Sequence, residues 1–117
     1  MKNDTASIIA NVVLQISEIY NIQPEYVIGK GKRHKAGEAR YIVYYYLHYE
    51  VGLSSSVIGR YFKCSRYNVL RGIRILKGWM EYHAETKERY QSIVEKLKGE
   101  GGPSSHFLTN FHYISAV

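Results

Sequence analysis

The stretch from Ser54 to Lys77 combines a purely cationic set of charges with an apolar repeat. It contains six basic side chains and no acidic one: Arg60, Lys63, Arg66, Arg71, Arg74 and Lys77. Apolar residues recur through it at helical spacing: Val57, Ile58, Phe62, Val69, Leu70, Ile73 and Leu76. A solvated helix normally mixes acids with bases, because interleaved charges stabilise the helix and relieve self-repulsion. We therefore expect a partner outside the chain to supply the missing anions.

The same stretch has the pattern of two helices joined by about three residues. The first helix is expected over about residues 55–62, capped by a serine among residues 54–56, and the second from near Ser65 to about Lys77. In a helix-turn-helix the first helix needs a very small residue where the second crosses it, and Gly59 occupies that position. The expected buried face consists of Ile58, Phe62, Cys64, Val69 and Ile73.

The opposite face of the second helix carries side chains that can hydrogen-bond to duplex DNA. They are Ser65, Arg66, Tyr67, Asn68 and Arg71. In a major groove, Arg pairs favourably with guanine and Asn with adenine. The alternative is a small helical bundle whose basic face is only solvated, and the absence of any acid from Lys63 to Met80 argues against it.

Charge along the chain is distributed unevenly. The formal net charge is +6, yet residues 29–78 hold eleven Lys and Arg against two Glu, whereas the remainder holds five Lys and Arg against eight acids. Such asymmetry points to nucleic acid or to an anionic membrane surface. We expect no membrane partner, because the apolar residues that a membrane-bound helix would expose are needed here for a core. A single cysteine, Cys64, excludes an intrachain disulfide, and we expect a cytoplasmic protein.

The rest of the pattern predicts one all-α domain, a bundle of five or six helices over residues 1–98. Helices are expected over 5–20, from Pro24 for a short run, and over about 38–51 until Gly52 ends the helix. A long stripe beyond Gly78 ends at Lys98. Residues 99–117 read as a flexible linker and an apolar tail, which we expect to dock on its own domain or, by self-association, on another copy.

We expect neither catalysis nor a cofactor. Cys64 with His48 or His83 could be imagined as a nucleophile and base, but a small residue at the turn is the better interpretation of Cys64. The five histidines lack the spacing of metal ligands, and the chain contains no G-x-x-x-x-G-K-[ST] phosphate loop. No metal and no small-molecule substrate are therefore expected.

In order and spacing, the chain resembles the C-terminal DNA-binding domain of the bacterial replication initiator DnaA. The resemblance rests on "ISEIYNIQPEYVIGKGKRH", then "AGEARYIVYYYLHYEVGLSSSVIGRYF" and "NVLRGIRILK", and covers approximately residues 12–98. That family has a similar first helix, a basic loop, a helix with R-x-I-A-x-Y-L, then "GLSLPEIGRxF" and a "TTVLHA" helix. The resemblance implies a Trp-repressor-like helix-turn-helix that binds duplex DNA.

Site residues follow from this resemblance. Lys32 falls on the family's loop arginine that enters the minor groove, within a basic loop that also holds Lys30, Arg33 and Lys35. Arg40 falls on a residue that contacts phosphate, and Ser54 and Ser55 fall where a helix start approaches phosphate. The base-reading segment "KCSRYNVL" is one residue shorter than the family's "GGRDHTTVL", so the initiator's own DNA box is not the expected target.

The sequence thus predicts a regulatory protein that binds double-stranded DNA, serving transcription, replication control or a mobile element. The second helix would enter the major groove and the loop from Lys30 to Lys35 the adjacent minor groove. Arg40, Ser54, Lys63 and Arg74 would contact phosphates. An alternative from a different class stays open, a protein-binding adaptor that keeps the initiator-like fold without reading DNA sequence.

Overall fold

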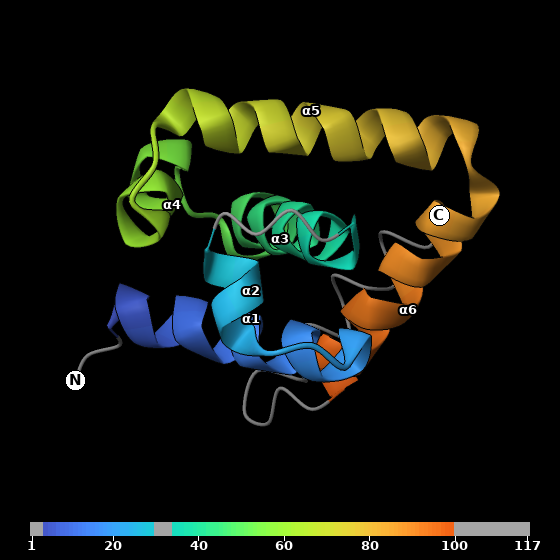
Figure 1. The fold of residues 1–117 in the computed structure, drawn as a ribbon, viewed down its shortest axis with the longest axis horizontal. Helices are drawn as coiled ribbons and strands as arrows, with labels where there is room; N and C mark the ends of the chain where they lie inside the picture. The colour runs from blue at the N-terminus through green and yellow to red at the C-terminus, as the bar shows by residue number, and fades with distance from the viewer. Residues whose placement is uncertain (1–3, 30–33, 100–117) are drawn as a thin grey trace.

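The computed structural model describes residues 4–29 and 34–99, and within them every regular element is helical (Figure 1). The elements are α1 (Thr5–Tyr20), α2 (Pro24–Ile28), α3 (His34–Tyr46), the π-helical turn η1 (Leu47–Val51), α4 (Ser55–Phe62), α5 (Arg66–Tyr82) and α6 (Ala84–Gly99). The prediction of an all-α bundle of five or six helices is confirmed for this part of the chain. The predicted linker and tail beyond Gly99 lie outside the described residues, as do Lys30, Lys32 and Arg33 of the basic loop.

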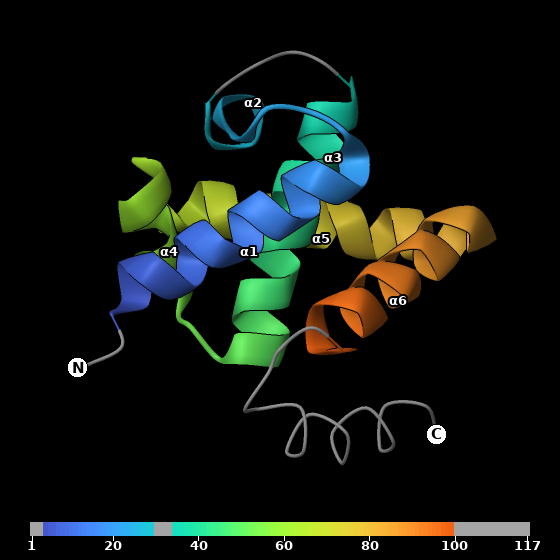
Figure 2. The same ribbon diagram turned by 90° about the horizontal axis from the view of Figure 1, so that it is seen from below.

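α3 is the central helix of the bundle. It lies between α5 on one side and α1 on the other, with α4 and α6 at opposite ends of the arrangement (Figures 1 and 2). Its Ile42 and Val43 are fully buried, and so is Leu47 at the start of η1. The tyrosine-rich segment therefore forms a helix despite its strand-favouring composition, because packing on several sides of α3 outweighs local propensity.

The starts of α4 and α5 follow the signals in the sequence. Gly52 takes a left-handed conformation with φ 93°, as predicted for the residue that ends the preceding helix. The Oγ of Ser54 accepts a hydrogen bond of 3.2 Å from the amide of Val57, and the Oγ of Ser65 accepts one of 3.2 Å from Asn68. Both helices therefore begin with a capped first turn.

The break expected near Gly78 was wrong. α5 continues through this glycine to Tyr82, and the chain leaves helical geometry at His83 (φ −131°, ψ 104°). A glycine costs a helix interior about 1 kcal/mol relative to alanine, which neighbouring contacts can offset. Here Leu76 is fully buried, and the ring of Trp79 packs on that of Tyr41 with 5.8 Å between centroids.

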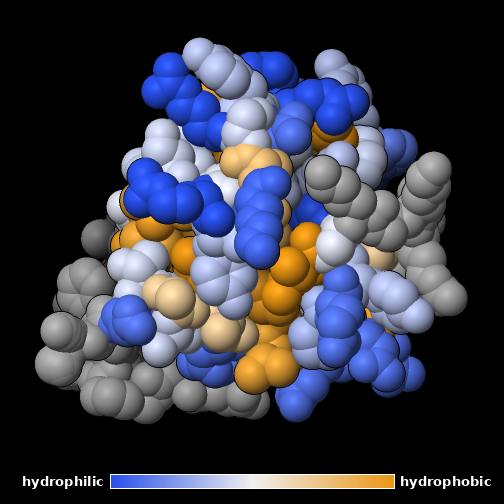
Figure 3. All heavy atoms as spheres, turned by 60° about the vertical axis from the view of Figure 1, so that its left-hand side comes forward, coloured by the Kyte–Doolittle hydropathy of each residue, from blue (hydrophilic) through white to orange (hydrophobic). Residues whose placement is uncertain are grey.

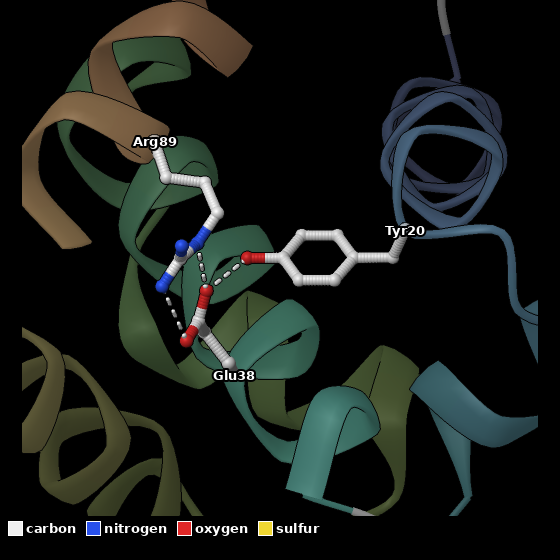
Figure 4. A network of polar contacts seen from close by, with 3 residues as sticks. All are labelled: Tyr20, Glu38 and Arg89. Atoms are coloured by element: carbon white, nitrogen blue, oxygen red, sulfur yellow. Dashed lines mark hydrogen bonds and ion pairs between the residues drawn. The ribbon is translucent and has the colours of Figure 1, made fainter. Parts of the chain in front are cut away.

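A polar network joins three helices that are far apart in the sequence (Figure 4). The Nε of Arg89 on α6 lies 2.8 Å from Oε2 of Glu38 on α3, and the hydroxyl of Tyr20 on α1 donates a hydrogen bond to the same oxygen. Burial and this bond to Glu38 raise the pKa of Tyr20 above its ordinary value. A second ion pair, with 3.1 Å between Lys98 Nζ and Glu50 Oε1, holds the end of α6 to η1.

Candidate nucleic-acid interface

α4 and α5 form a tight helix–turn–helix unit. The turn between them consists of residues 63–65, and Lys63 adopts left-handed geometry with φ 58°. The amide of Cys64 donates to the carbonyl of Gly59 at 2.9 Å. A Cβ at Gly59 would lie 2.7 Å from the carbonyl oxygen of Cys64, so the predicted need for a very small residue at this position is confirmed.

The inner side of this unit packs into the core. Ile58, Phe62, Val69 and Ile73 are buried, as predicted. Cys64 is only half-buried, with its Sγ 3.8 Å from the hydroxyl of Tyr44, because the turn lies at the edge of the core. The ring of Phe62 meets that of Tyr44 edge-on, with 5.1 Å between centroids. A rigid apolar base therefore supports the outer surface of the two helices.

The outer surface carries all the charge of the stretch from Ser54 to Lys77. Each of its six basic side chains is exposed: Arg60, Lys63, Arg66, Arg71, Arg74 and Lys77. The ion pairs of Arg89 with Glu38 and of Lys98 with Glu50 both lie elsewhere in the described part of the chain. Figure 3 shows strongly hydrophilic side chains gathered over the upper part of this end of the molecule, at the level of α5. The surface is thus a cationic area whose six basic side chains form no ion pair with a described residue.

The N-cap and first turns of α5 expose every residue predicted to hydrogen-bond to DNA from this helix: Ser65, Arg66, Tyr67, Asn68 and Arg71. Two of these side chains contact each other. The Nη2 of Arg66 donates to the hydroxyl of Tyr67 at 3.1 Å, and its Cζ lies 5.0 Å from the centroid of the Tyr67 ring. Tyr67 is 66% exposed, so its ring is accessible to a partner.

The residues that were assigned to phosphate contacts through the family resemblance are less exposed than those at the start of α5, or already have hydrogen-bond partners within the chain. Ser54 is exposed but its hydroxyl already caps α4, and Ser55 is half-buried. Arg40 is half-buried, and its Nε and Nη2 donate to the carbonyls of Val27 and Tyr26 at 2.8 and 2.9 Å. Arg40 therefore holds the end of α2 against α3. Lys35, which was predicted to lie in the basic loop, lies instead in the first turn of α3, because this helix begins at His34 rather than near residue 38.

Sequence reasoning did not distinguish between the two glycines on α5. Gly72 is buried where α5 crosses α3, and a Cβ there would lie 2.7 Å from the ring of Tyr41. Gly78, by contrast, has no atom within 4 Å of a Cβ. A glycine inside a helix is a visible signal, but only the structure separates one that packing requires from one that it does not.

An open pocket of about 710 Å³ lies between η1, α5 and α6, away from α4. Its lining mixes basic residues with acidic ones, among them Lys77, Glu81, Lys87 and Glu95. Among the described residues, no group of three or more His, Cys, Asp or Glu could hold a metal ion. Nor does any described helix have the length and apolar character needed to cross a membrane.

Neither a protein-family model nor a curated protein matches the chain. The function of the surface formed by α4 and α5 must therefore be argued from its own geometry and charge.

Proposed function

We propose that the chain binds double-stranded DNA through α4 and α5, with the start of α5 in the major groove. The observation that carries this proposal is the exposed, unneutralised set of cations on a rigid helix–turn–helix base. The phosphate backbone of DNA is a polyanion that suits such a surface. Each Lys or Arg that neutralises one of its phosphates releases condensed counterions, which favours binding.

The shape of α5 supports a groove-binding role. The helix runs along one edge of the molecule with its outer side uncovered (Figure 1). Its 17 residues span about 25 Å, and a helix about 10–12 Å wide fits a major groove about 12 Å wide. Arg66 and Asn68 can hydrogen-bond to base edges, while Lys63 and Arg74 can contact phosphates. The resemblance to the initiator's DNA-binding domain agrees with this orientation.

The basic loop would contribute from the adjacent minor groove, with Lys30, Lys32 and Arg33 reaching the DNA. The role of Arg40 in this proposal is to anchor rather than to contact phosphate. Its hydrogen bonds to the carbonyls of Tyr26 and Val27 fix the end of α2, from which the loop departs. A rigid support of this kind positions a flanking contact at little entropic cost.

A protein-binding adaptor is the alternative, and the pocket between η1, α5 and α6 favours it as a docking place. The two functions differ in their response to salt. The affinity of a DNA complex falls linearly in log–log form as phosphate counterions are released, whereas an apolar protein interface barely responds.

The test is selection of bound fragments from random duplexes at near-physiological salt, followed by titrations of the selected site over a range of salt concentrations. Lys63→Gln should reduce the salt slope by about one unit. Lys96→Gln, the same change on the exposed side of α6, is the matched control and should leave the slope unchanged. The proposal is wrong if the wild-type chain retains no duplex, or if both variants change the slope equally.

A further inference from the structure

One line of residues on α5 faces directly away from the core. The buried side of the helix is formed by Val69, Gly72, Ile73 and Leu76. At 3.6 residues per turn, the opposite line passes through Tyr67, Arg71, Arg74 and Gly78. Arg66 and Asn68 fall on the two flanks of this line. A partner approaching α5 head-on would therefore meet Tyr67, Arg71 and Arg74 before it met Arg66 or Asn68.

Gly78 on this line has no structural reason to be glycine. Gly59 and Gly72 are each within 2.7 Å of a neighbouring atom once a Cβ is added, whereas Gly78 meets nothing within 4 Å. Its φ lies outside the left-handed region that favours glycine. Glycine in a helix interior nevertheless costs about 1 kcal/mol relative to alanine. A residue that weakens the helix and fills no packing need points to a requirement outside the chain, such as the close approach of another backbone.

Arg66 is less available for reading bases than its exposure suggests. Its guanidinium is hydrogen-bonded to the hydroxyl of Tyr67 at 3.1 Å and lies over the ring of that residue. A bidentate contact with guanine would require this arrangement to be given up. Arg71, one turn further along the outward line from Tyr67, is exposed.

We infer that DNA contacts α5 along about three turns of this outward line, with Arg71 reading the base sequence and Gly78 allowing the closest approach of the DNA backbone. This inference rests on the proposed DNA binding. The line from Tyr67 to Gly78 is about 17 Å long at 1.5 Å per residue. Glu81 follows one turn later and is exposed, so its carboxylate would repel phosphates and limit the contact at that end.

The first test adds bulk to the outward line. Gly78→Leu should weaken binding to the selected duplex at least about tenfold, a loss comparable with that of a mismatched base pair. Gly99→Leu is the matched control, because a Cβ at Gly99 also meets nothing within 4 Å and the residue ends α6. Melting temperatures of both variants verify that they remain folded. Equal affinities for the two variants would overturn the assignment of Gly78.

The second test separates base reading from general attraction. Arg71→Ala should weaken binding to the selected duplex about 5- to 150-fold while scarcely changing binding to random duplex. Arg66→Ala should lower both affinities by a similar small factor. Reversed behaviour of the two variants, or equal losses for Arg71→Ala on both duplexes, would overturn the inference while leaving DNA binding intact. Failure of the wild-type chain to bind any duplex would instead overturn the proposed function, and the inference with it.

Discussion

Replacing Gly59 by alanine tests how closely the turn between α4 and α5 is packed. The new Cβ would lie 2.7 Å from the oxygen of Cys64, 3.2 Å from the carbonyl carbon of Ser65 and 3.3 Å from the amide nitrogen of Arg66. Ordinary contacts begin near 3.4 Å, so the first distance must grow by about 0.7 Å. All three neighbours are backbone atoms, which cannot rotate away as a side chain can.

Gly78→Ala is the control that isolates this steric effect. Both substitutions gain the same helix propensity of about 1 kcal/mol, but only Gly59→Ala overpacks the turn, at about 1–3 kcal/mol. Gly78→Ala should therefore raise the melting temperature, and Gly59→Ala should melt roughly 4–24 °C below it, given about 4–8 °C per kcal/mol for a small domain. Gly72→Ala should fall between them, because the clashing atoms belong to the side chains of Tyr41 and Tyr44 rather than to the backbone.

Thermal unfolding followed by circular dichroism measures all three variants under the same conditions. If Gly59→Ala and Gly78→Ala stabilise the chain equally, the turn is looser than described and the register of the helix–turn–helix unit is misplaced. A lower melting temperature for Gly78→Ala would mean that this glycine serves the fold, which would remove the argument for its role at the DNA.

Three further perturbations test other parts of the structure. Burial is the main cause that raises the pKa of five tyrosines, to about 12 for Tyr46, so the folded state keeps protons that the unfolded chain loses near pH 10. The stability that these groups contribute should be complete below pH 10 and should fall as the pH rises through the folded-state values. Helical circular dichroism and tyrosinate absorbance should then change together rather than separately. Lys98→Met should lower the free energy of unfolding by roughly 3 kcal/mol in chemical denaturation, because it leaves the 13% exposed carboxylate of Glu50 without its cation. Adding Glu50→Gln should recover part of that loss, whereas a solvent-exposed pair would show neither the loss nor the recovery. Arg40→Gln should speed amide hydrogen exchange in α2 by releasing the end of that helix, and unchanged exchange there would refute its anchoring role.

Local signals in the sequence predicted much of the helix–turn–helix unit. Ser54 and Gly52 act through their own backbone and near neighbours, and the apolar spacing from Ile58 to Ile73 fixes which side faces inward. The continuation of α5 through Gly78 was not predictable in this way. It depends on the contact between Trp79 and Tyr41, residues from two helices whose approach no local pattern encodes.

In the candidate site, too, local sequence signals predicted some features and not others. Exposure of the basic residues follows from periodicity, but the contact between Arg66 and Tyr67 and the bonds from Arg40 to α2 depend on side-chain conformations. The sequence shows that an arginine is charged, but it does not show which acceptor within the chain its guanidinium hydrogen-bonds to. The same holds for Glu38, a lone acid in a basic segment, which turned out to accept bonds from both α1 and α6.

The position of Glu38 has a consequence for the order in which the chain folds. It bonds to Tyr20, 18 residues earlier, and to Arg89, 51 residues later. Closing the longer of these loops costs about 0.9 kcal/mol more in chain entropy than closing the shorter. The contact between Gly59 and Cys64, by contrast, spans a single turn. We therefore expect α4 and α5 to acquire protection early in pulse-labelled hydrogen exchange and α6 to dock last. The cationic surface would then form before α6 packs against α1 and α3.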